Sequence, residues 1–407
     1  MKRKLYFCVE FSIIYMKMRF NIVSLFFVGW MGVCFSSMAA NENKEISASD
    51  TVSEYRRSLL KRLLDYLEES DKPDPTKKID WGFLAGPHYS SDSGLGLGLV
   101  ASGLYSMDRS DSLLPQSNVS LYGDITTKAF MLIGLRGNNI FPKKKYRLDY
   151  RVYIYTFPSD FWGIGFENAD NDENESEYKR IKVELMTRFQ FKIAENAFLG
   201  PIARFQLVRA YSLDEKARAL LNGESRVVHD YGIGISYTYD TRDFILNAYR
   251  GWFIQFDLLA NPRFLGNHSN YLTSDLSVST YRQVWKGGVL AGEFHYRQSA
   301  GDVPWAMLAE VGSSNRMRGY YEGRYRDKNL MEAQIELRQH VWKRNGIVLW
   351  AGLAEVYPDF GELRWNRILP NAGIGYRWEF KKRVNVRLDY GFTRNGGGFL
   401  FNINEAF

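Results

Sequence analysis

The chain has 407 residues, of which 45% are hydrophobic and 15% are aromatic, and its formal net charge is +7. A negative mean hydropathy together with so many aromatic residues excludes a helical membrane protein. It favours a membrane β-barrel, in which only every second residue of a strand faces lipid. The basic residues are spread along the sequence rather than clustered, and this distribution excludes nucleic acid as a partner.

A secretory leader is predicted over residues 1–40. The apolar run 22–35 follows two basic residues, and small residues that end at Ala40 form a cleavage region. Because the first residues are unusual for a signal peptide, Met16 and Met18 are alternative start sites. Both cysteines of the chain lie within this leader, so the mature protein is expected to have neither a disulfide nor thiol chemistry.

A short periplasmic helix is predicted in the segment 41–78. Thr51 and Glu54 have the spacing of a capping box. Five leucines then repeat on one helix face, namely Leu59, Leu60, Leu63, Leu64 and Leu67. This apolar stripe either rests on the protein's own barrel or docks a periplasmic partner or a membrane surface.

From residue 79 to residue 407 the sequence has the period of two that is typical of β-strands. In the segment 330–342, apolar residues alternate with Glu332, Gln334, Glu336, Arg338 and His340. Charged faces recur beside aromatic-rich faces on long strands, which indicates lipid on one side and water on the other. We therefore predict an all-β fold, a transmembrane antiparallel β-barrel that occupies residues 79–407 in the bacterial outer membrane.

About sixteen strands are expected, an even number that places both ends of the barrel in the periplasm. The predicted ranges are 81–91, 95–107, 118–127, 129–138, 146–157, 180–193, 197–211, 228–241, 251–263, 271–285, 288–299, 330–342, 346–357, 368–379, 383–394 and 398–406. Long connections alternate with short ones, as external loops alternate with periplasmic turns. The strand 346–357 is apolar on both faces, so another part of the chain is expected to pack on it from inside.

The segment 315–329, NRMRGYYEGRYRDKN, crowds four arginines around two glycines. Its Met317–Tyr320 portion resembles the (V/I)RG(F/Y) signature of the bacterial surface antigen superfamily, the outer-membrane assembly and secretion barrels typified by BamA and TamA. In that family the motif lies between strands eleven and twelve, where the alternation also places it. The end of the chain resembles the family's C-terminal assembly signal, through Phe399, Phe401, Ile403 and Phe407.

The resemblance implies that this loop folds into the barrel and that Arg318 pairs with a carboxylate on the inner wall. Glu336 and Glu355 are the candidates, and Glu355 stands where the family more often has aspartate. Gly319 would allow the tight bend and Tyr320 would pack on the wall. An arginine in a narrow lumen must be paired, because a lone buried charge is costly. The pair either serves only as a structural lock or also takes part in transport.

The family's activity does not transfer with its fold, because the predicted helical segment is too short for the periplasmic POTRA domains of assembly barrels. No catalytic, metal-binding or cofactor-binding residues are predicted, and we expect no enzyme activity. Outer-membrane lipid and periplasmic or outer-membrane proteins are the expected partners. Three functions remain open: an accessory in outer-membrane biogenesis that works through a lateral seam between 82–91 and 398–406, a plugged pore or secretion channel, and a structural barrel that docks a periplasmic partner through its N-terminal helix.

Overall fold

The computed structural model describes residues 78–90, 93–111 and 114–407. The predicted leader and the leucine stripe of the N-terminal segment lie outside these residues. Within the described ranges, no helix has the length and apolar character needed to cross a membrane.

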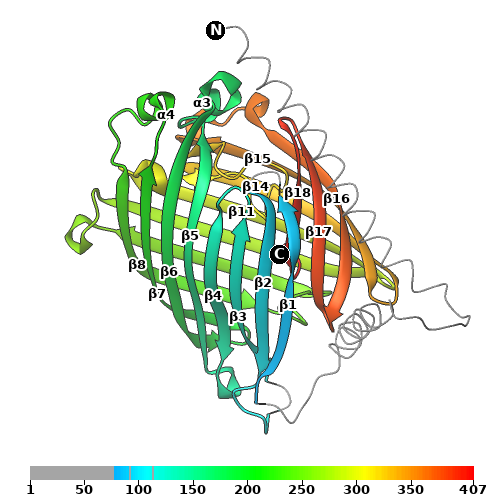
Figure 1. Ribbon diagram of the computed structural model, residues 1–407. Helices are drawn as coiled ribbons and strands as arrows, with labels where there is room; N and C mark the ends of the chain where they lie inside the picture. Colours follow the sequence, from blue (N-terminus) through cyan, green and yellow to red (C-terminus); the bar gives the residue numbers. More distant parts are fainter. Residues whose placement is uncertain (1–77, 91–92, 112–113) are drawn as a thin grey trace, which may run out of the picture. The chain divides into compact units, whose positions relative to one another are not determined.

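Sixteen strands form one antiparallel sheet (Figure 1), and each strand pairs with the next along the chain except that β11 pairs with β14. The strands of this sheet are β1 (Asp80–Ser90), β2 (Gly94–Tyr105), β3 (Ser117–Thr126), β4 (Met131–Ile140), β5 (Tyr146–Phe161), β6 (Ser176–Ala194), β7 (Ala197–Tyr211), β8 (Val227–Asp240), β9 (Gly251–Asn261), β10 (Tyr271–Trp285), β11 (Gly288–Gly301), β14 (Asn329–Trp342), β15 (Asn345–Tyr357), β16 (Leu369–Lys381), β17 (Val384–Thr393) and β18 (Gly396–Ile403). The two terminal strands, β1 and β18, lie beside each other, so the sheet curls into a barrel. The predicted fold class and strand number are confirmed.

The strand alternation separates a polar interior from an apolar exterior. On β14, Glu332, Gln334 and Glu336 are buried inside, whereas Ala333 and Ile335 between them are exposed. Apolar side chains with about half or more of their surface exposed cover the outside of other strands, among them Leu97, Ile133, Ile154, Ile235, Leu353 and Ile374. This outward-facing apolar band is the surface that a membrane barrel presents to lipid.

Long and short connections separate to the two ends of the barrel. The short turns include 195–196, 286–287 and 343–344, and they define the periplasmic end. The long loops at the external end contain two short helices, α3 (Phe166–Asp170) and α4 (Glu215–Leu220). Six 3-10 helices complete the connections: η2 (Pro142–Lys144), η3 (Asp172–Asn174), η4 (Arg263–Leu265), η5 (Trp305–Met307), η6 (Phe360–Glu362) and η7 (Trp365–Arg367).

The last strand ends earlier than predicted, at Ile403 rather than at residue 406. Asn404 has the left-handed φ of 70°, which interrupts the extended backbone. Its N–H donates a 2.7 Å hydrogen bond to the carbonyl oxygen of Asn385 on β17. The chain therefore leaves the sheet at this turn, and Phe407 does not belong to β18.

Candidate functional site

The connection between β11 and β14, residues 302–328, folds back into the barrel. Its two short strands, β12 (Ala309–Glu310) and β13 (Arg326–Asp327), pair with each other. Met317, Tyr320 and Tyr325 are buried in one hydrophobic cluster with Ala354 and Val356 of β15. The inner apolar face of β15, for which the sequence predicted a packing partner, is thus covered by this loop.

All four arginines of the predicted loop motif have carboxylate partners. The pairs are Arg316 with Glu293 (2.8 Å), Arg318 with Glu336 and Asp389, Arg324 with Asp172 (2.5 Å), and Arg326 with Glu310 (3.1 Å). Burial opposes the charge of Arg316, but the Glu293 carboxylate outweighs it and raises the pKa of Arg316. The loop that looked overloaded with positive charge is therefore neutralised inside the barrel.

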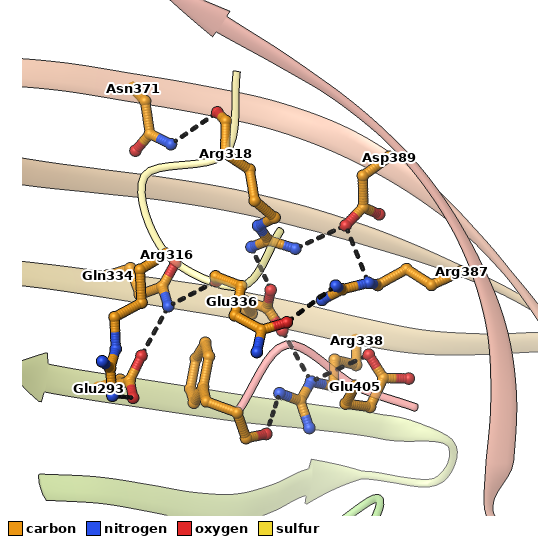
Figure 2. Close-up of polar contacts among 12 residues, drawn as sticks. Glu293, Arg316, Arg318, Gln334, Glu336, Arg338, Asn371, Arg387, Asp389 and Glu405 are labelled. Atoms are coloured by element: carbon orange, nitrogen blue, oxygen red, sulfur yellow. Dashed lines mark hydrogen bonds and ion pairs between the residues drawn. The ribbon is translucent and has the colours of Figure 1, made fainter. Parts of the chain in front are cut away.

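Arg318 sits at the centre of the polar interior (Figure 2), and its side chain and those of both partners are fully buried. One terminal guanidinium nitrogen donates to Asp389 Oδ2 at 2.8 Å, and the other donates to Glu336 Oε1. The guanidinium carbon also lies 3.9 Å from the ring centroid of Trp350 on β15. A planar cation with two carboxylates and an aromatic face suits arginine and not lysine.

Glu355, the other carboxylate expected to hold Arg318, lies elsewhere. Its Oε1 accepts a 2.7 Å hydrogen bond from the backbone N–H of Arg364 in the β15–β16 loop. Trp350 is the residue of β15 directly opposite Glu336, so Glu355 lies five residues further along, or about 17 Å at ~3.3 Å per residue. The structure therefore brings Arg318 to Glu336 and not to Glu355.

Asp389 is the partner that the sequence analysis did not name. It lies on β17, fully buried, two residues after Arg387 on the same inner face. The alternation of 383–392 already places Asp389 on the polar side, so the pattern contains this signal. What the pattern lacks is the distance between strands, which only the closed barrel sets.

Two glycines allow the loop backbone to touch the barrel wall. Gly319 has a φ of 102°, and a Cβ placed on it would lie 2.7 Å from the carbonyl oxygen of Gly391 on β17. A Cβ on Gly391 would lie only 2.1 Å from the carbonyl oxygen of Arg318. Next to this contact, the Tyr320 hydroxyl donates to the Pro370 carbonyl oxygen at 2.8 Å, and burial raises the pKa of Tyr320 to about 12.

Arg318 also belongs to a closed ring of alternating charges, in which each side chain contacts two of opposite sign. In order, this ion-pair ring consists of Arg318, Glu336, Arg338, Glu405, Arg377 and Asp389. Each side chain of the ring is at most 7% exposed. The ring joins one loop residue, four residues on β14, β16 and β17, and one residue of the C-terminal tail.

The predicted C-terminal signal residues divide into two groups. Phe399 packs on Tyr390 of β17 with ring centroids 4.5 Å apart, and Phe401 pairs with Leu388 in the strand register. Phe407, beyond the turn, packs inside against Tyr281 and below the Arg338 guanidinium. The aromatic residues therefore do not form one continuous face of the last strand.

The edge strands of the sheet meet at a recess rather than at a backbone ladder. In the sheet order β1 and β18 are the two ends, and within the described residues no register pairs them. The recess is lined by Gly82, Val100, Ser102 and Leu104 on one side and by Phe380, Val384 and Ile403 on the other. Val384 and Ile403 are buried there although the alternation places them opposite the inward-facing Asp389. The periplasmic end of β17–β18 thus tucks against β1–β2 through apolar contact.

Comparison with known proteins agrees with this architecture. A family profile described as the Omp85 superfamily domain matches residues 137–407. Among solved structures, the chain is similar to BamA from Haemophilus ducreyi lacking POTRA domains 1-3, with a TM-score of 0.51, 12% identity, and coverage of 79% of this chain and 70% of that one.

Two CdiB structures are similar as well. CdiB from Escherichia coli gives a TM-score of 0.53 at 13% identity, and CdiB from Acinetobacter baumannii gives 0.50 at 10% identity. Each alignment covers 81% of this chain but only 60% of the CdiB chain. The sequence gave no match among curated proteins. The barrel, its inward loop and the profile over residues 137–407 lead to one conclusion: the chain belongs to the Omp85 superfamily of bacterial outer-membrane β-barrel proteins.

Proposed function

We propose that this barrel is an accessory in outer-membrane biogenesis, which inserts or translocates protein or lipid through the seam between β1 and β18. The seam carries the proposal, because its strands meet through an apolar recess and not through a ladder of hydrogen bonds. Unpaired strand edges can template an incoming strand. Apolar overlap opens at lower cost than a complete ladder, since it is non-directional and leaves no backbone donors without partners inside.

A disulfide across the seam tests this function. Cysteines that replace Ser102 and Ile403 face the same recess from its two sides. In the native strain, oxidation of this pair is expected to change the protein and lipid composition of the outer membrane. Addition of a reductant is expected to restore it, and each single-cysteine variant serves as a matched control. Wild-type envelope composition with the disulfide fully formed would contradict the proposal.

A plugged pore or secretion channel is the second candidate, and the inward loop favours it. The Arg318 side chain lies in the barrel interior, where residues 302–328 occupy space that a cargo would need. Replacement of Arg318 by alanine is expected to raise conductance in planar bilayers if the loop is the plug of a channel. A barrel that stays silent in both forms argues for the seam instead.

The third expectation, a periplasmic partner docked on the leucine stripe of the N-terminal segment, concerns residues outside the described ranges. It stays a prediction for affinity purification. Deletion of residues 51–70 is expected to remove one partner from the material captured from native outer membranes. An unchanged partner set would contradict it.

A further inference from the structure

The periplasmic end of the barrel contains a crossing segment that the strand pattern did not predict. Residues 241–250 connect β8 to β9, but they reach as far as the β16–β17 turn. Arg383 in that turn donates to the carbonyl oxygen of Asn247 at 2.7 Å and to Asp243 Oδ2 at 2.8 Å. Four strands of the sheet separate β9 from β16, so the segment crosses the barrel mouth.

The C-terminal tail, residues 404–407, completes the same layer. The N–H of Glu405 donates to the carbonyl oxygen of Leu246 at 3.4 Å. Phe407 packs with Ala248 of the crossing segment and with Tyr281 and Ala291 of the barrel wall. We call residues 241–250 and 404–407 together the periplasmic floor.

The floor is tied to the external loop through buried charge. Glu405 Oε2 accepts a 2.8 Å hydrogen bond from Arg377 Nε, and Arg377 in turn donates to Asp389 Oδ1 at 2.5 Å. On the other side, Arg338 donates to Glu336 Oε2 at 2.9 Å and to the carbonyl oxygen of Phe407 at 3.0 Å. Asp389 and Glu336 are the two carboxylates that hold Arg318. The loop that enters from outside and the tail that enters from the periplasm therefore bind one ion-pair ring.

The charge balance of this ring couples its two occupants. Arg387 also approaches Asp389, at 3.5 Å, so four buried arginines share three carboxylates. If the tail leaves, Glu405 leaves with it and the four arginines keep two carboxylates. If the loop leaves, Arg318 leaves with it and both carboxylates that held it reorient toward Arg338 and Arg377. Either departure changes the field that holds the other occupant, and buried charges are only weakly screened.

We propose that the periplasmic floor is a gate, latched by Glu405, and that the external loop and the C-terminal tail release together because they share the ion-pair ring. The barrel is thereby closed at both ends by one electrostatic lock. Displacement of either element from its own side weakens the closure at the opposite side. The coupling goes beyond the proposed function, since it concerns how the bore opens and not what passes.

Reaction of a single cysteine in the tail tests the coupling. In a full-length chain with Cys8→Ser and Cys34→Ser, Ala406→Cys places a thiol at a residue that is 5% exposed. In nanodiscs, its rate of modification by a hydrophilic maleimide reports tail release. Arg318→Met and Glu405→Gln are each expected to raise this rate at least tenfold, which corresponds to about 1.4 kcal/mol in the release equilibrium.

Three controls make the result decisive. Glu195→Gln removes the same charge from an exposed turn at the same end of the barrel, and it is expected to leave the rate unchanged. A cysteine in place of the buried Ala210 on β7 reports general loosening, and its rate should stay at the wild-type value in every variant. Arg318→Lys keeps the charge but not the two-pronged contact, so an intermediate rate is expected even if Arg318→Met folds poorly.

The gate itself is read from conductance in planar bilayers, with the purified protein and without a client. Glu405→Gln is expected to increase the open probability and Glu195→Gln to leave it unchanged. A wild-type labelling rate in Arg318→Met overturns the coupling, and faster labelling of Glu405→Gln without any conductance overturns the gate. Neither readout depends on the β1–β18 seam, so a failed disulfide test would leave this proposal intact, and the reverse also holds.

Discussion

The ion-pair ring predicts an order of destabilisation that charge counting can decide. Replacement of Arg318 by methionine removes two charge-assisted hydrogen bonds and the contact with Trp350. It leaves three buried arginines facing three carboxylates, because Arg387 lies beside the ring. Glu336 keeps Arg338 at 2.9 Å, so no carboxylate is left without a partner. Methionine also retains much of the packing of the arginine stem.

Replacement of Glu336 by glutamine has a larger cost. It leaves four buried arginines with only two carboxylates, and the side chain it changes is fully buried. Removal of one partner from a buried pair costs about 3–5 kcal/mol, and we expect Glu336→Gln in that range. For Arg318→Met we expect about 2–3 kcal/mol, because the loss of two charged hydrogen bonds is offset by the better charge balance. An exposed pair contributes below about 1 kcal/mol, so Arg364→Met, which breaks the exposed contact with Glu362, is the matched control.

Urea unfolding of the purified protein in lipid vesicles, followed by tryptophan fluorescence, measures these differences. The gel mobility of unheated samples verifies that each variant forms a barrel. The expected order of destabilisation is Glu336→Gln, then Arg318→Met, then Arg364→Met. If Arg318→Met is as destabilising as Glu336→Gln, the charge-balance argument is wrong. If all three are equal, the buried pairs contribute no more than an exposed one.

Three further predictions follow from the same contacts. Gly391→Ala is expected to expel the loop and to raise conductance, because the added Cβ would lie 2.1 Å from the Arg318 carbonyl oxygen, whereas Gly123→Ala on β3, with no heavy atom within 4 Å of the added Cβ, should behave as wild type in planar bilayers. Trp350→Leu is expected to cost about 2 kcal/mol or less beyond the lost ring area in urea unfolding, because a desolvated cation–π contact contributes on that scale, and no change in the midpoint would contradict the contact with Arg318. Burial opposes the charge of Glu405, but Arg377 and Arg338 outweigh it and lower the pKa of Glu405, so its stabilising contribution is full above the ordinary glutamate pKa of about 4.3 and is lost as pH falls through the lower folded-state value. The difference in urea midpoint between wild type and Glu405→Gln should therefore stay constant from neutral pH to about pH 5 and shrink at lower pH, and a difference independent of pH would contradict the role of the charge.

Local pattern was sufficient for the barrel and insufficient for its interior. The period of two separates the inner Glu336 from the outer Ile335 without any knowledge of neighbours, and it predicted sixteen strands that the structure contains. The same pattern leaves the choice between Glu336 and Glu355 open, because both are carboxylates on adjacent strands. Their depth along the barrel axis depends on the strand register, and the register that sets Glu336 opposite Trp350 is a property of the closed sheet.

The periplasmic floor lay beyond sequence reasoning for a different reason. The strand periodicity ends at residue 241, and the connection 241–250 has no period of its own that would predict its path. The end of the chain suggested the opposite of what the structure contains, since its hydrophobic residues continue the alternation of a lipid-facing strand up to Phe407. A single left-handed residue, Asn404, redirects the chain inward, and asparagine tolerates this conformation better than most residues.

The two closures of the barrel differ in a way that bears on how it could work. At the seam, β1–β2 and β17–β18 meet through apolar side chains, which lose little specificity when lipid replaces one side. Inside the bore, the loop and the tail are held by buried ions, whose separation is costly unless another charged group takes their place. A lipid or strand edge is therefore suited to displace the seam, and a polypeptide with its own carboxylates or guanidinium groups is suited to displace the ring. The chemistry of whatever opens this barrel can accordingly be read from which of the two contacts it replaces.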